Sequence, residues 1–214
     1  MDESHQQSAV EVVVAAHGWR ASVSSTGATL RQVSVDGIDV VDGFDRGQAP
    51  SAARGQLLAP WTNRLRDGRY AFGGRSHQLE ITDPATTTAL HGLVGAAPWQ
   101  VVRHDAGSAT LEHRLTGARG YPWDLLLRVT YEIDAAGLAV THEARNLSPD
   151  AAPYAVGAHP YVVAGPGAVD GWTIALDASE VMLVDAERML PSAVVGVVTD
   201  DHMLCDRATS RASS

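Results

Sequence analysis

The chain has 214 residues, an apolar fraction of 45% and a formal net charge of −9. This length suits one domain with a sizeable core. The acidic balance argues against a nucleic-acid partner, because a phosphate backbone needs clustered positive charge and no basic run occurs. All 16 basic residues are arginine, so chemistry that requires a lysine amine, such as Schiff-base formation, is excluded.

Short apolar bursts alternate with turn residues along the chain, and this pattern is typical of many short strands. Helical periodicity is nearly absent. We predict a paired segment over residues 125–146 and further strands at residues 10–15, 19–24, 30–35, 69–72, 78–81, 99–103, 109–115, 172–176 and 181–184.

Two hairpins give the strongest local signals. In residues 33–41, Asp36-Gly37 supplies the positive φ angles of a tight turn. In residues 125–146, apolar and polar side chains alternate on both sides of a turn at residues 134–137, so one face is buried and the other faces water. Together these elements predict an all-β protein folded as an antiparallel β-sandwich.

The organisation expected for the chain is one domain over residues 1–214. The polar ends, about residues 1–9 and 208–214, are expected to be disordered, and no internal repeat or linker-like run interrupts the rest.

The cysteine content and the first residues indicate the compartment. Cys205 is the single cysteine, so the fold has no internal disulfide and no thiolate cluster for structural zinc. Residues 1–7 lack the basic and apolar parts of a signal peptide, and no stretch of about 18 apolar residues is present to cross a bilayer. We therefore expect a cytoplasmic protein with no membrane partner.

Three loop-like segments place polar side chains beside aromatic residues, glycine and proline, where a chain leaves a strand and lines a cleft. His91 stands out because the glycine after it permits close approach of a ligand. His159 stands out because Pro160 and Tyr161 fix the loop and offer a stacking face. The three segments are residues 58–74, 89–94 and 156–161.

Two other kinds of site are disfavoured by the motifs. A metal site usually uses closely spaced ligands, but His91 and His159 are far apart in sequence, and neither His-x-His nor His-Glu-x-x-His occurs. A serine hydrolase requires an exposed nucleophile on a Gly-x-Ser-x-Gly elbow, and that motif is missing.

Taken together, the motifs of these segments resemble the aldose 1-epimerase (galactose mutarotase) family. They are Asn63-Arg64 with the downstream Gly-x-Tyr-x-Phe-x-Gly, then Leu90-His91-Gly92, then Gly157-x-His159-Pro160-Tyr161. The order of the motifs carries more weight than any single one, and the resemblance covers roughly residues 12–207. It implies a galactose mutarotase-like supersandwich that binds a small-molecule sugar and needs neither cofactor nor metal.

The resemblance also implies roles for particular residues. Arg64, with Asn63 beside it, would bind sugar hydroxyls, and Tyr161 would line the same site. His91 would hold the ring-oxygen and anomeric region, and His159 would be the general acid that protonates the ring oxygen. A further substrate-binding aspartate would be Asp206, in the segment Cys205-Asp206-Arg207.

The sequence departs from the family pattern at its end. The family's base is a glutamate nearer the C-terminus of a longer protein, and no residue here matches it. Glu143, Glu180 and Glu187 fall in segments that align elsewhere, and we expect them to be solvated carboxylates. The sandwich is therefore expected to be incomplete at the C-terminus, with a homodimer or a partner chain covering the exposed edge.

Three functions stay open from the sequence. The first is mutarotation of a free hexose such as galactose or glucose. The second is epimerisation of a hexose phosphate, in which Arg66 and Arg69 would hold the phosphate. The third is a non-catalytic carbohydrate-binding module, or a structural remnant, which would follow from the missing glutamate.

Overall fold

The computed structural model describes residues 9–196. Two compact units make up the chain, Met1–Val163 and Ala164–Ser214, and the single domain expected from the sequence stays a prediction. Within the described residues the helical elements are three-residue 3₁₀ turns and all other elements are strands, so the all-β class is confirmed. Within the same residues no helix has the length and apolar character to span a bilayer.

The first sheet of the larger unit contains the N-terminal strands. β1 (Glu11–Ala16), β2 (Trp19–Ser24), β3 (Thr29–Val35) and β4 (Ile38–Asp39) form an antiparallel meander in that order. The three longer strands begin and end within one residue of the predicted bounds, because a glycine-containing turn follows each apolar segment.

The second sheet contains the longest strands. β10 (Gln100–His104), β11 (Ser108–Leu115), β12 (Leu125–Asp134) and β13 (Gly137–Asn146) are antiparallel and adjacent in that order. β13 lies at the edge of this sheet, and β12 is its partner among the described residues. The expectation that a second copy or a partner chain covers this edge stays a prediction.

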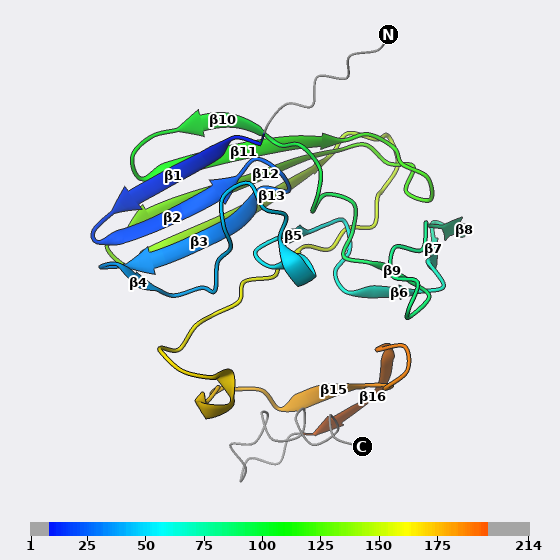
Figure 1. Ribbon diagram of the computed structural model, residues 1–214. Helices are drawn as coiled ribbons and strands as arrows, with labels where there is room; N and C mark the ends of the chain where they lie inside the picture. The colour runs from blue at the N-terminus through cyan, green and yellow to red at the C-terminus, as the bar shows by residue number, and fades with distance from the viewer. Residues whose placement is uncertain (1–8, 197–214) are drawn as a thin grey trace. The chain divides into compact units, whose positions relative to one another are not determined.

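The two sheets pack face to face, with β1 against β11 and β12, and β2 against β13. Figure 1 shows the two layers. Each fully buried Val or Leu contributes about 1.5–3 kcal/mol, so the shared core is what holds the antiparallel sandwich together. Its members include Val12, Val14, Ala21, Val23, Val33, Ala109, Leu111, Leu127, Val129, Tyr131 and Ile133.

Both predicted hairpins are confirmed as strand pairings, but the buried face expected for the second one is wrong along β13, where Val140 and Ala144 are exposed. Asp36 and Gly37 have φ angles of 49° and 81°, the left-handed pair that a two-residue turn matching the strand twist requires. The β12–β13 ladder pairs Leu125 with Asn146 at one end and Asp134 with Gly137 at the other.

Two predicted strands are wrong. The strand expected at residues 78–81 lies earlier, at β8 (Arg75–Gln78), because the tight turn at Gly73-Gly74 pairs Phe72 directly with Arg75. Residues 172–176 form no strand, since no segment among the described residues pairs with them, and alternation without a partner gives no ladder.

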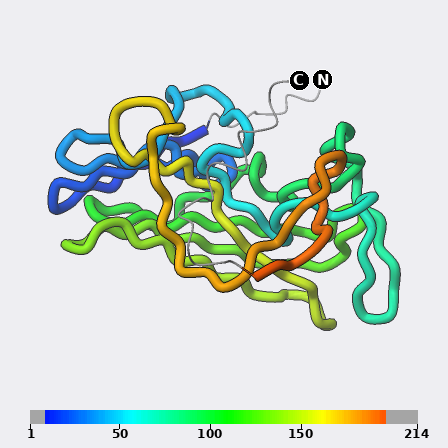
Figure 2. The backbone as a smooth tube through the Cα atoms, turned by 90° about the horizontal axis from the view of Figure 1, so that it is seen from below, coloured from blue at the N-terminus to red at the C-terminus, as the bar shows by residue number. Residues whose placement is uncertain are grey.

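Short strands connect the sandwich to the loops that carry the predicted site residues. They form three antiparallel two-stranded sheets: β5 (Leu57–Leu58) with β14 (Gly157–Ala158), β6 (Arg64–Arg66) with β9 (Thr88–Leu90), and β7 (Arg69–Phe72) with β8. A 3₁₀ turn, η1 (Ser51–Ala53), precedes β5. Figure 2 shows the β7–β8 hairpin projecting at one end of the larger unit, with the β1–β2 turn at the opposite end.

The smaller unit contains η2 (Val169–Gly171) and a hairpin of β15 (Glu180–Val184) and β16 (Pro191–Gly196). Asp185 shapes the connection, because its carboxylate accepts the backbone N–H groups of Arg188 at 2.6 Å and Leu190 at 3.1 Å. The hairpin confirms the strand predicted at residues 181–184.

Candidate functional site

The three sequence segments meet at one cleft of about 600 Å³ within the larger unit. Of the six predicted site residues, five line this cleft: Asn63, Arg64, His91, His159 and Tyr161. The sixth, Asp206, lies outside the described residues, so its predicted role stays a prediction.

A second cleft, of about 610 Å³, lies beside the β7–β8 hairpin and is lined by Phe72, His77 and Trp123 among others. Its aromatic rings pack on one another, with the His77 and Trp123 centroids 5.0 Å apart. We place the candidate site in the first cleft because two imidazoles and a guanidinium converge there, which gives it acid–base and hydrogen-bonding chemistry.

Backbone pairing brings the histidine segments together. Gly157 pairs with Leu58 across β14 and β5, and Ala59, one residue further on, forms a parallel bridge with Gly92. The buried indole of Trp61 donates to the carbonyl of Ala89 at 3.3 Å. The segment around β5 therefore lies between the two histidine loops and fixes the position of both.

His91 sits on a turn with an unusual backbone. Its φ is 62° and that of Gly92 is 81°. A Cβ at Gly92 would lie 2.0 Å from the carbonyl oxygen of Ala59, so only glycine allows this close approach. The glycine predicted to permit close approach of a ligand in fact permits close approach of the protein's own backbone.

The hydrogen bonds of His91 determine its tautomer. The backbone N–H of Asn63 donates to Nδ1 at 3.2 Å, and the backbone N–H of His91 donates to the carbonyl of Asn63 at 3.0 Å. Because Nδ1 accepts, the neutral ring carries its proton on Nε2. Burial lowers the pKa of His91, and the nearby charges of His159 and Arg64 lower it further. His91 is therefore a neutral donor at physiological pH.

His159 lies against two other rings. Its centroid is 5.4 Å from that of His91, with the planes at 77°, and 5.4 Å from that of Tyr161, with the planes at 26°. Its backbone is held on both sides, since its N–H donates to Gln56 and its carbonyl accepts from Gly55. The ring position is thus determined by neighbouring rings and by a fixed main chain.

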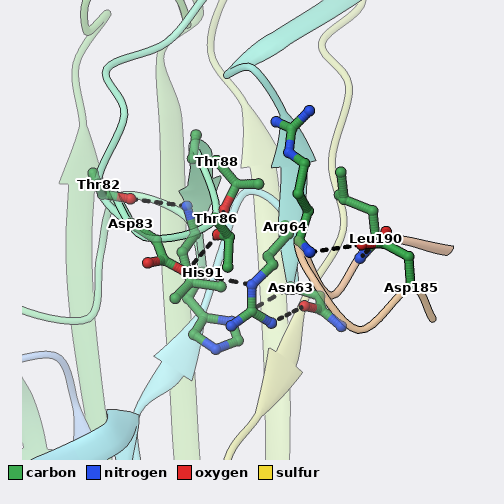
Figure 3. Close-up of polar contacts among 12 residues, drawn as sticks. Asn63, Arg64, Thr82, Asp83, Thr86, Thr88, His91, Asp185 and Leu190 are labelled. Atoms are coloured by element: carbon green, nitrogen blue, oxygen red, sulfur yellow. Dashed lines mark hydrogen bonds and ion pairs between the residues drawn. The ribbon is translucent and has the colours of Figure 1, made fainter.

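Arg64 is oriented by a carboxylate and an amide. Its Nε donates to Asp83 at 3.4 Å, and its terminal nitrogen donates to the side-chain oxygen of Asn63 at 3.3 Å. The hydroxyl of Thr86 donates to the same Asp83 carboxylate at 2.7 Å. This hydrogen bond and the charge of Arg64 lower the pKa of Asp83. Figure 3 shows Arg64 and Thr86 both contacting the Asp83 carboxylate.

Tyr161 contacts the loop before β5. Its hydroxyl donates to the carbonyl of Ala52 at 3.3 Å, and the guanidinium of Arg54 lies over its ring, 4.9 Å from the centroid. Arg54 in turn forms an ion pair of 2.9 Å with Asp42. Sequence reasoning missed Arg54, Asp42 and Asp83, because each acts through a residue distant in sequence.

No carboxylate is among the residues that line the cleft in the described part of the chain. Glu143 lies on β13 near Arg128 of β12, with 3.6 Å between the charged groups and 58% of its side chain exposed, as expected for a solvated carboxylate. Across residues 9–196 no cluster of three or more His, Cys, Asp or Glu side chains has the arrangement of a metal site.

Comparison with known sequences identifies the family. The aldose 1-epimerase family model matches residues 11–205. The Escherichia coli K12 protein YihR is 35% identical over 175 residues, which are 81% of this chain and 57% of YihR. YphB of the same organism is 29% identical over 155 residues, 66% of this chain and 51% of YphB. The chain thus spans between half and three-fifths of these curated relatives.

Solved structures give the same fold. The GalM/aldose epimerase homologue from C. elegans superposes with a TM-score of 0.76 at 26% identity, over 90% of this chain and 62% of that one. A putative aldose 1-epimerase from Escherichia coli K12 has a TM-score of 0.74 at 19% identity, over 90% of this chain and 63% of that one. The galactose mutarotase-like sandwich is therefore confirmed, and from the match over residues 11–205 the chain belongs to the aldose 1-epimerase family.

Proposed function

We propose that the chain interconverts the α and β anomers of a free hexose, such as galactose or glucose, by acid–base ring opening. The observation that carries this proposal is the pair of imidazoles, His91 and His159, whose centroids lie 5.4 Å apart in a cleft that Arg64 also lines. Membership of the aldose 1-epimerase family supports the general kind of reaction.

The chemistry requires the anomeric hydroxyl to lose one proton while the ring oxygen gains another. Because no carboxylate is among the described residues that line the cleft, water in the open cleft is the proposed acceptor of the anomeric proton, and closure of the ring on the other face reverses both transfers. His159 is the proposed acid, since an imidazole exchanges protons readily near neutral pH and a positioned acid contributes about 10²–10⁴-fold. His91, neutral and protonated on Nε2, is the proposed hydrogen-bond donor to the ring-oxygen and anomeric region. Arg64 and Asn63 are the proposed partners of the hydroxyls.

The arginines of the site favour an uncharged sugar over a phosphosugar. Arg64 is paired with Asp83 at 3.4 Å, and Arg54 is paired with Asp42 at 2.9 Å. A phosphate would need positive charge that is not already compensated. Arg66 and Arg69, the candidates for phosphate binding from the sequence, are not among the residues that line the cleft.

A second function, a sugar-binding module without catalysis, is favoured by one observation. The described residues that line the cleft include no carboxylate, whereas the resemblance assigns the base of the family to a glutamate. Such a module would keep the donors of Arg64 and His91 for recognition but would leave the anomeric proton in place.

Polarimetry of freshly dissolved α-D-galactose and α-D-glucose distinguishes these functions. Acceleration above the spontaneous rate, lost in His159→Ala and retained in the exposed control His104→Ala, is the result expected for a mutarotase. Saturable binding of either sugar without acceleration would support the binding module. A chain that neither binds nor converts a free sugar would contradict both proposals.

A further inference from the structure

Tyr161 is held by two groups that belong to neither histidine segment. The guanidinium of Arg54 lies 4.9 Å from its ring centroid, and its hydroxyl donates to the carbonyl of Ala52. Both groups come from residues 52–54, at the end of the loop that precedes β5. The Tyr161 ring therefore touches this loop in addition to its stack on His159.

The Asp42–Arg54 ion pair closes this loop. The two charged groups approach to 2.9 Å, and Arg54 also donates to the carbonyl of Gly43 at 3.1 Å. The backbone N–H of Asp42 donates to the carbonyl of Tyr161 at 2.7 Å. Asp42 thus contacts Tyr161 directly through the backbone and indirectly through Arg54. The two ends of the loop, Asp42 and Arg54, are therefore both connected to Tyr161.

These contacts link neighbouring side chains one after another, from Asp42 to His159, the proposed acid. Asp42 orients the guanidinium of Arg54, the guanidinium packs on Tyr161, and Tyr161 stacks on His159 with 5.4 Å between centroids. A cation over a tyrosine ring is worth about 0.5–2 kcal/mol, depending on how far it is desolvated. The Arg54 side chain is only 24% exposed, which places this contact in a partly desolvated setting.

We propose that Arg54 is a positioning residue, which together with Asp42 holds the Tyr161 ring against His159 and so fixes the direction of the imidazole in the cleft. The role rests on the proposed function, in which His159 transfers a proton to the sugar. An imidazole displaced by about 1 Å loses up to about 100-fold in rate when proton transfer depends on its geometry.

Replacement of Arg54 is expected to leave the fold intact. Its Nε is buried and has no hydrogen-bond partner among the described residues, and a buried unpaired donor offsets part of what the other contacts contribute to stability. Its ion-pair partner Asp42 is 58% exposed, so it remains hydrated without the arginine. Arg54→Met is therefore a usable variant, and Arg54→Lys keeps the charge near Asp42 and the ring.

The test measures the ring stack and the rate separately. Nuclear Overhauser effects between the His159 and Tyr161 rings report the stack in the full chain whether or not it is active. We expect them to weaken at least about twofold in Arg54→Met, to be restored in Arg54→Lys, and to be unchanged in Arg103→Met, which removes an exposed arginine paired with Asp105.

The second measurement is the rate of mutarotation, followed by polarimetry for the same variants and for Tyr161→Leu. We expect Arg54→Met to lower kcat about tenfold with little change in KM, and the double variant Arg54→Met/Tyr161→Leu to be no slower than Tyr161→Leu alone, because both act through one ring. Unchanged Overhauser effects in Arg54→Met, or multiplicative rate reductions in the double variant, would overturn the proposal. If the wild-type chain is inactive while Arg54→Met still weakens the Overhauser effects, the proposed function fails and the positioning of the ring stands.

Discussion

The close approach at Gly92 leads to a quantitative prediction for Gly92→Ala. The added Cβ would lie 2.0 Å from the oxygen and 2.4 Å from the carbon of the Ala59 carbonyl, and Cβ contacts below 3.0 Å are essentially never seen. Ala59 is fully buried and accepts a hydrogen bond of 2.7 Å from the backbone of Leu93. The backbone must therefore move by about 1 Å at a position with no room to move.

Gly37 provides a matched control. Its φ is also 81°, and a Cβ there meets nothing within 4 Å. Both substitutions place alanine in the left-handed region, which costs about 1 kcal/mol. Gly92→Ala adds overpacking of about 1–3 kcal/mol and strain on one hydrogen bond of about 1 kcal/mol. We expect a loss of about 1 kcal/mol for Gly37→Ala and about 3–5 kcal/mol for Gly92→Ala.

Urea unfolding of both variants and the wild type gives the difference in free energy. Since 1 kcal/mol corresponds to about 2–4 °C in Tm for a domain of this size, thermal unfolding should separate the variants by roughly 10 °C. Equal losses of stability for the two variants would refute the reasoning, because they would show that the contact with Ala59 is relieved at no cost.

Two further predictions concern charge. Asp83→Asn should weaken sugar binding about 3- to 10-fold, the value of one oriented hydrogen bond, because it leaves Arg64 without its carboxylate. Calorimetric titration beside the exposed control Asp105→Asn measures this, and an unchanged Kd would contradict it. Burial lowers the pKa of His142 as it does that of His91, so the unfolded chain binds more protons and stability should fall as pH drops below about 6.5. His142→Leu should flatten this fall between pH 7.5 and 5.5 in urea unfolding, and an equally steep fall would contradict the assignment.

The sequence predicted the long elements of the fold well. β12 and β13 have ten residues each, burial alternates regularly along β12, and the β3–β4 turn carries the Asp-Gly pair that a two-residue turn needs. Long periodic strands and turns with special φ angles leave a signal in a single sequence. The strand expected at residues 78–81 was misplaced because apolar alternation alone does not give the length of the turn that precedes a strand.

The motif order predicted the residues that line one cleft in the structure, but it did not predict the contacts that support them. β5 and β14 have two residues each, which is too short for any periodicity, and they exist because the segment before Asn63 pairs with the segment that leads to His159. Asp83 and Arg54 carry no local pattern that links them to Arg64 or Tyr161. Such contacts depend on the assembled fold, so a single sequence contains no signal for them.

The wide separation in sequence of the segments that form the cleft affects the order of folding. The hydrogen bond from Tyr161 to Ala52 closes a loop of 109 residues, whereas that from Asn63 to His91 closes one of 28. Loop-closure entropy rises with loop length, so the half of the cleft around His91 can assemble from nearby chain. The half around His159 closes a loop that contains the whole second sheet, β10–β13, and is expected to form after it. Sugar binding to the completed cleft would then report the last long-range contacts of the larger unit, and a bound sugar should slow their opening.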